Sequence, residues 1–151
     1  MKKLERDIIK RLVEWKNMPH KKPLIIKGAR QVGKTFAIRQ FAKECYKEIV
    51  EINFERDLEY VKLFQSTRNP QDILNYLQLS FMENHFNKDT LLFLDEIQAC
   101  SEALTALKFL AEDFPCDIIC SGSMLGVAIA STSSFPVGYV ETWDMYRSEE
   151  H

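Results

Sequence analysis

An eight-residue segment restricts the possible folds of this chain more strongly than any other feature. Residues 28–35 read Gly-Ala-Arg-Gln-Val-Gly-Lys-Thr and match G-x-x-x-x-G-K-[ST] at every specified position. The apolar run Leu24-Ile25-Ile26 precedes the segment, and apolar residues at helical spacing follow it over about 34–45. A strand, a glycine-containing loop and a helix in this order turn backbone N–H groups inward, where they bind phosphate oxygens. The segment therefore predicts a phosphate-binding loop in an α/β fold.

The residue types in this loop fit the binding of a triphosphate. Gly28 and Gly33 permit backbone turns that a side chain would block. Lys34 would place a positive charge on the β- and γ-phosphates, and the Thr35 hydroxyl would ligate Mg²⁺. The loop backbone between the glycines supplies the remaining donors, from Ala29, Arg30, Gln31 and Val32. An accidental match in an ordinary turn is the alternative, and a solvent-facing side chain without a role is the alternative for Arg30.

Composition narrows the class of protein. With 151 residues, 46% hydrophobic and 28% charged, the chain suits one globular domain. The net charge of −2 excludes a strongly basic nucleic-acid-binding protein. No apolar run reaches about 18 residues, so no membrane span is expected. We expect the cysteines to be reduced core thiols of a cytoplasmic protein: Cys45, Cys100, Cys116 and Cys120.

Strand and helix patterns alternate along the chain. Helical spacing predicts helices over about 3–16, 34–45, 57–65, 70–81 and 101–111, the last two capped by Asn69 and Ser101. Short apolar or β-branched runs predict strands at 24–27, 49–54, 90–95, 117–120 and 137–143. Such alternation is typical of a mostly parallel sheet, here of about five strands, between two layers of helices. We expect Trp15 and Trp143 to serve in packing or at an interface.

The predicted strand at 90–95 ends in two acids. Residues 91–96 read Leu-Leu-Phe-Leu-Asp-Glu, the form of a Walker B strand. Ligands of open α/β sheets bind at this carboxyl edge. Asp95 would hold Mg²⁺ directly or through water, and Glu96 would accept a proton from the attacking water. Alternatively, Asp95 begins a loop and Glu96 is solvated.

Three further polar residues are candidates at the same edge. Ser121 follows a strand expected between the other two, where it would contact the γ-phosphate or the lytic water. Ser123 competes for that role, and an ordinary turn or helix cap also explains the Ser-Gly-Ser sequence. Gln98 would orient the water or a partner, or is a surface loop residue.

Together these motifs resemble an AAA-type ATPase, a P-loop fold of three α-β-α layers. The similarity is strongest to the N-terminal part of bacterial and archaeal ATPases that carry a C-terminal domain of unknown function, described as nuclease-like. Its main segments are KPLIIKGARQVGKT, FLDEIQ, IICSGSMLGVAI and SFPVGYVETWDMY. The resemblance implies Lys34 and Thr35 as nucleotide and Mg²⁺ ligands, Asp95 as the Walker B acid, Glu96 as the catalytic glutamate and Ser121 as the first sensor.

The chain departs from those proteins after residue 146. They continue with a Phe-Glu-Glu-Phe-like segment and a helical or winged-helix region, whereas this chain reads Arg-Ser-Glu-Glu-His. We therefore expect residues 1–151 to be an AAA-type core, with a helix over about 3–16 and a P-loop core over about 23–146, truncated before the lid and C-terminal domain. We accordingly expect no second sensor within these residues, and Arg147 is the only arginine after residue 68.

The sequence thus predicts binding of Mg·ATP and its hydrolysis to ADP and phosphate, coupled to an unseen domain or partner, with a homo-oligomer possible. The main alternative is a nucleotide-dependent binding module without turnover. A metabolite kinase is a weaker one, because Glu96 serves a hydrolase and not a kinase. A nucleic-acid role rests on family analogy alone.

Overall fold

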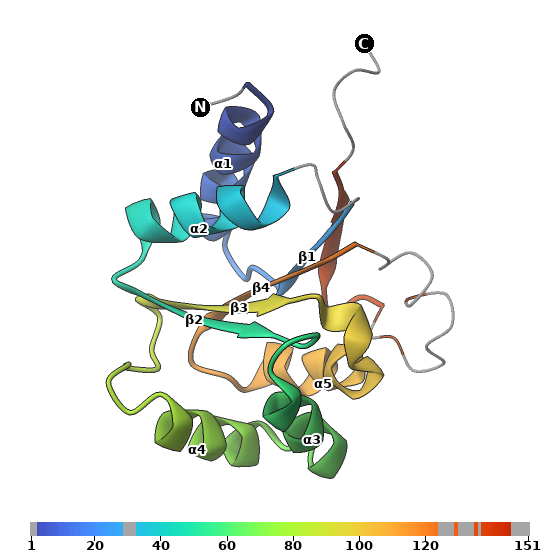
Figure 1. Cartoon of the computed structure of the whole chain (residues 1–151). Coiled ribbons are helices and arrows are strands. Elements are labelled where there is room, and N and C mark those ends of the chain that lie inside the picture. Colours follow the sequence, from blue (N-terminus) through green and yellow to red (C-terminus); the bar gives the residue numbers. More distant parts are fainter. Residues whose placement is uncertain (1–2, 29–32, 124–128, 130–134, 136, 146–151) are drawn as a thin grey trace.

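Five parallel strands form one sheet, and their spatial order differs from their order in the sequence (Figure 1). Neighbours run β2-β3-β4-β1-β5. The strands are β1 (Leu24–Lys27), β2 (Glu48–Asn53), β3 (Thr90–Asp95), β4 (Asp117–Gly122) and β5 (Glu141–Asp144). The helices are α1 (Lys3–Lys16), α2 (Lys34–Cys45), α3 (Leu58–Ser66), α4 (Pro70–Ser80), the 3₁₀ helix η2 (Ile97–Ala99) and α5 (Ser101–Glu112). This computed structural model describes residues 3–28, 33–123, 129, 135 and 137–145.

Helices cover both faces of the sheet, because side chains alternate between the faces along each strand. Leu24, Ile26 and Phe93 pack on α1 and α2. Ile25 and Leu94 point to the other face and pack on α3, α4 and α5. Figure 1 shows the two helical layers on opposite sides of the strands. The predicted three-layer α-β-α sandwich is confirmed.

Both tryptophans lie in the core, as predicted. Trp15 is 1% exposed and donates its indole N–H to the carbonyl of Lys22 at 2.9 Å. Trp143 is 4% exposed, and the Arg11 guanidinium lies 4.0 Å from the centre of its ring.

The four cysteines are free thiols, three of them buried. Burial raises the pKa of Cys100 to about 11 and that of Cys116 to about 12, so both thiols are neutral at pH 7. Neutral, enclosed thiols are poor nucleophiles, which fits a packing role.

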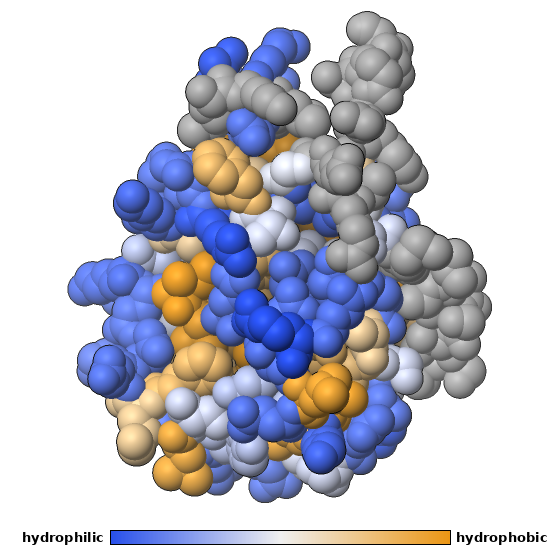
Figure 2. All heavy atoms as spheres, in the orientation of Figure 1, coloured by the Kyte–Doolittle hydropathy of each residue, from blue (hydrophilic) through white to orange (hydrophobic). Residues whose placement is uncertain are grey.

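Large apolar side chains on the surface are scattered. Figure 2 shows orange areas on the face in view that are separated by hydrophilic residues. The most exposed of these side chains are Met82 and Val137, each 80% exposed. In the described part of the chain, no helix combines the length and apolarity needed to cross a bilayer.

Two local predictions were wrong. The last strand covers Glu141–Asp144 and not 137–143, because Gly138 has a φ of 91° and breaks the extended backbone. The cap of α5 is Cys100, since its carbonyl already accepts the N–H of Ala103 at 3.0 Å. Ser101 is therefore the first helical residue.

The end of β5 lies close beside the end of β1, its parallel neighbour in the sheet. The Met145 N–H donates to the Lys27 carbonyl, and Lys27 and Asp144 form an ion pair at 3.1 Å. A Cβ atom added to Gly28 would overlap the Met145 carbonyl oxygen. The close approach of the Met145 backbone therefore requires glycine at this position.

We expect Gly28→Ala to lower the free energy of unfolding by about 1–3 kcal/mol, the usual cost of forcing extra atoms into a packed site. The Met145 backbone must move, and the β1–β5 pairing must adjust with it. Urea denaturation of the variant and the parent measures the difference. An unchanged unfolding midpoint would show that the β5 end yields without cost.

The predicted cap of α4 is confirmed and allows a second test. Asn69 Oδ1 accepts the N–H groups of Gln71 at 2.8 Å and Asp72 at 3.3 Å. Asn69→Ala leaves these donors without their side-chain acceptor and should cost about 1 kcal/mol of stability in urea denaturation. Asn69→Asp keeps an acceptor and should retain the parent midpoint; an equal loss in both variants contradicts this assignment.

Candidate functional site

The carboxyl ends of β1, β3 and β4 meet at one edge of the sheet. The register pairs Ile26 with Ser121 on one side of β4 and Leu94 with Cys120 on the other. Asp95, one residue after Leu94, thus comes beside Ser121. β1 ends at Lys27 and α2 begins at Lys34, whose Thr35 neighbour reaches Asp95 at the same edge. This is where open α/β sheets bind ligands.

Asp95 is the centre of the buried polar network. Only 6% of this residue is exposed to solvent. Oδ1 accepts hydrogen bonds from Ser121 Oγ at 2.7 Å and from the Glu96 N–H at 2.9 Å, and Oδ2 accepts from Thr35 Oγ1 at 3.4 Å. A carboxylate withdrawn from water needs such donors. Three segments far apart in the sequence therefore converge on one side chain.

The start of α2 presents Lys34 to the same edge. Gly33 has a φ of 85°, a left-handed conformation that favours glycine, and lies at the N-cap of the helix. Lys34 is 5% exposed, and its ammonium donates to the Gly28 carbonyl at 2.8 Å. The free N–H groups and the positive end of the dipole at a helix start attract anions.

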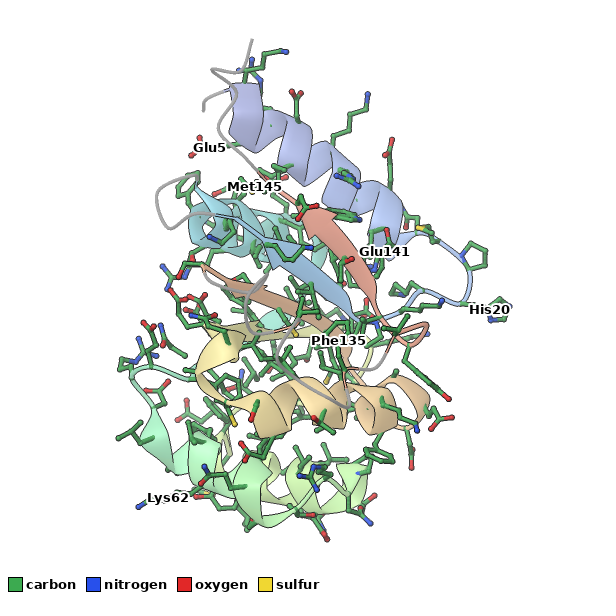
Figure 3. All side chains as sticks on the ribbon, turned by 90° about the vertical axis from the view of Figure 1, so that its right-hand side faces the viewer. Glu5, His20, Lys62, Phe135, Glu141 and Met145 are labelled. Atoms are coloured by element: carbon green, nitrogen blue, oxygen red, sulfur yellow. The ribbon has the colours of Figure 1, made fainter. Side chains whose placement is uncertain are left out.

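α1 also approaches this loop. Glu5 Oε2 would lie 3.4 Å from a Cβ atom on Gly33. Glu5 and Met145, both labelled in Figure 3, come from segments at opposite ends of the sequence, and each adjoins a glycine of the loop. The sequence patterns contained no signal for either contact.

Glu96 has different surroundings from its neighbour Asp95. Its φ of 52° and ψ of 46° are left-handed, which is uncommon for a residue other than glycine. Oε1 accepts from Gln98 Nε2 at 2.8 Å and from Ser123 Oγ at 3.4 Å. The two serines of the Ser-Gly-Ser sequence are thus divided between the acids, Ser121 on Asp95 and Ser123 on Glu96.

The structure brings together the predicted residues that it describes: Gly28, Gly33, Lys34, Thr35, Asp95, Glu96 and Ser121. The expected contributions of Ala29, Arg30, Gln31 and Val32 lie outside the described residues. Contact of Ser121 with a γ-phosphate stays a prediction, since its hydroxyl here binds Asp95.

The turn after β2 was not anticipated as part of this edge. Asn53 pairs with Asp95 in the register of β2 and β3. Its side-chain oxygen accepts the N–H groups of Glu55 and Arg56, and its own N–H donates to Asp57. The hydrogen bond from Arg56 holds the pKa of Asp57 below its usual range. The spacing of Asn53 and Asp57 is typical of a turn, so this hydrogen-bonded turn could have been predicted from the sequence.

The side chains at the edge fit a hydrated magnesium ion that arrives with a nucleotide. Thr35 Oγ1 and Asp95 Oδ2, both hard oxygen ligands, lie 3.4 Å apart. Among the residues that the structure describes, no group of three or more His, Cys, Asp or Glu side chains could hold a metal. Mg²⁺ commonly takes only one or two protein ligands and completes its shell with waters and phosphates.

Comparison with solved structures shows the fold of this chain in other proteins. RuvB of Thermotoga maritima, described as a Holliday junction branch migration motor, matches with a TM-score of 0.54 and 18% identity over 99% of this chain and 47% of RuvB. A chain of Drosophila ORC bound to DNA matches with a TM-score of 0.62 and 14% identity, over 95% of this chain and 92% of that chain. The chain thus spans about half the length of RuvB.

Sequence comparison identifies the family. No curated protein matches the chain. A family model described as an AAA domain matches residues 20–149, which include both glycines of the loop, the acidic strand end and β5. The chain therefore belongs to the AAA domain family, as an AAA-type P-loop ATPase core.

Proposed function

We propose that this chain binds Mg·ATP at the carboxyl edge of the sheet and hydrolyses it to ADP and phosphate, coupling the reaction to another domain or protein. The observation that carries the proposal is the convergence of Thr35, Ser121 and the Glu96 N–H on the buried Asp95 carboxylate, next to Lys34. Membership of the AAA domain family supports nucleotide binding independently.

Nucleotide binding would use the start of α2. The Lys34 ammonium, which donates to the Gly28 carbonyl, exchanges that partner for oxygens of the β- and γ-phosphates. The N–H groups of the loop and of the first helical turn take up further phosphate oxygens. Lys34 is already enclosed, so little side-chain freedom remains to be lost on binding.

Thr35 and Asp95 are the proposed magnesium ligands. Magnesium bound to them would neutralise negative charge on the β- and γ-phosphate oxygens. Ser121 holds Oδ1 of Asp95 and leaves Oδ2 facing Thr35, which orients the carboxylate. We assign Ser121 a second role as the sensor of the γ-phosphate.

Glu96 would act on the attacking water. Its carboxylate aligns the water in line with the γ-phosphorus and accepts a proton as the new P–O bond forms. The bond between the γ-phosphorus and the bridging oxygen breaks, and ADP leaves. Its position one residue after the buried acid places it beside the proposed metal ligands.

We propose a homo-oligomer as the active form, in which a neighbouring copy supplies a cation to the γ-phosphate. An arginine in this position raises the rate by about 10³–10⁵ where it is used. ORC is described as bound to DNA, and RuvB is described as a Holliday junction branch migration motor. The net charge of −2 gives no support to a similar partner here, and none is proposed.

Lys34→Ala should weaken Mg·ATP binding by at least roughly 30-fold, since removing one partner of an enclosed charge pair costs about 2–5 kcal/mol. Isothermal titration calorimetry measures the affinity, and circular dichroism checks the fold. Lys43→Ala, on the exposed end of the same helix, is the matched control and should bind as the parent does. Unchanged affinity in Lys34→Ala would contradict the assignment of the loop.

Glu96→Gln should keep Mg·ATP affinity and lose turnover by about 10²–10⁴-fold, the usual contribution of a general base. Phosphate release is measured over a range of protein concentrations, with Glu112→Gln at the exposed end of α5 as the charge-matched control. Specific activity that rises with concentration supports assembly of the site between copies. Phosphate release by the parent no faster than by Glu96→Gln refutes hydrolysis and favours a nucleotide-dependent binding module.

A further inference from the structure

We propose that Gln98 is a positioning residue that fixes the direction of the Glu96 carboxylate. The inference rests on the proposed role of Glu96 toward water. Gln98 Nε2 donates to Glu96 Oε1 at 2.8 Å, a charge-assisted hydrogen bond across two residues of the chain. With one carboxylate oxygen held, rotation of the group is restricted, and the direction of its second oxygen is set.

The orientation of the Gln98 amide follows from its partner. A carboxylate oxygen only accepts, so the amide atom 2.8 Å away must be the nitrogen. The amide oxygen consequently points away from Glu96. It is buried, and it has no hydrogen-bond partner among the residues that the structure describes. The contact with Glu96 thus holds the amide in place even though its other end is unsatisfied.

The backbone around Gln98 is fixed on both sides. Ile97 is fully buried, and the Glu96 carbonyl accepts the Ala99 N–H at 3.1 Å. The Cys100 N–H donates to the Ile97 carbonyl at 3.0 Å and completes the short helix η2. A rigid single turn therefore carries Gln98, and the left-handed backbone of Glu96 brings the two side chains together.

Ser123, the residue after β4, adds a second, weaker restraint. Its Oγ lies 3.4 Å from the same oxygen, Glu96 Oε1. The carboxylate is thereby held by η2 through a short hydrogen bond and by the residue after β4 through a longer one. Gln98 is the stronger of the two by distance, and it has no role in the Asp95 network.

The test compares phosphate release and Mg·ATP affinity in the parent, Gln98→Met, and Gln98→Met combined with Glu96→Gln. Gln98→Met keeps the length of the side chain and removes both polar atoms. It should lower kcat by roughly 10- to 100-fold, as misplacement of a catalytic group does, with unchanged affinity. In the Glu96→Gln background it should cause no further loss, because the two residues act as one unit.

The chain offers a matched control. Gln40 Nε2 donates to Glu44 Oε2, also at 2.8 Å, on the exposed side of α2. Gln40→Met removes the same kind of hydrogen bond and should leave kcat and affinity unchanged. A parental kcat in Gln98→Met, or an equal loss in the Glu96→Gln background, overturns the proposal. The second outcome would indicate general damage to the site.

A readout independent of turnover separates this inference from the proposed function. If the parent releases no more phosphate than Glu96→Gln, the proposed hydrolysis is refuted. The side-chain amide resonances of Gln98 in ¹⁵N-labelled protein then test whether Gln98 contacts Glu96. They should shift in Glu96→Ala and stay in place in Glu112→Gln. If the resonances stay in place in Glu96→Ala, the contact is overturned. A Gln98 variant is needed only to assign these resonances.

Discussion

The rest of the site depends on the buried carboxylate of Asp95. A charged group that is 6% exposed is stable only where donors replace water. Its three donors come from the first turn of α2, from the backbone after β3 and from the end of β4. They meet because β4 lies between β3 and β1 in the sheet and α2, which carries Thr35, follows β1 in the chain. The strand order and the polar network therefore require one another.

A second constraint links Gly28, the first residue of the phosphate-binding loop, to the edge strand β5. β1 pairs with β4 on one side and with β5 on the other, so its last residues take part in both the site and the β5 edge. Gly28 has no Cβ and lies against the Met145 carbonyl, while its own carbonyl accepts from Lys34. A residue that sequence patterns assign to phosphate binding is thus also a packing residue. If a phosphate took the Lys34 ammonium from the Gly28 carbonyl, the change would act directly on the Gly28 peptide group.

Features set by local sequence or by the parallel order of the strands were predictable, and other tertiary contacts were not. The strand at 90–95 and the helix at 3–16 have the predicted bounds, because apolar spacing and capping residues act within a few positions. The meeting of Thr35 and Asp95 followed from the parallel sheet. The approach of Met145 to Gly28 was not visible, since it joins segments more than 100 residues apart. The strand predicted at 137–143 was placed too early, because the alternation of residue types does not show the positive φ of Gly138.

Two adjacent acids acquire different chemistry from their backbones. Asp95 ends an extended strand, points into the sheet edge and is held by three donors, one of them a rigid backbone N–H. Glu96 turns into the left-handed region, which breaks the strand alternation and directs its side chain to Gln98 and Ser123. The Asp95 carboxylate is thus buried and fixed by its donors, whereas the Glu96 carboxylate is half-buried and contacts two side chains from outside that network. The change of backbone conformation between residues 95 and 96 therefore gives the two acids separate surroundings, which supports the proposed division into a metal ligand and a proton acceptor.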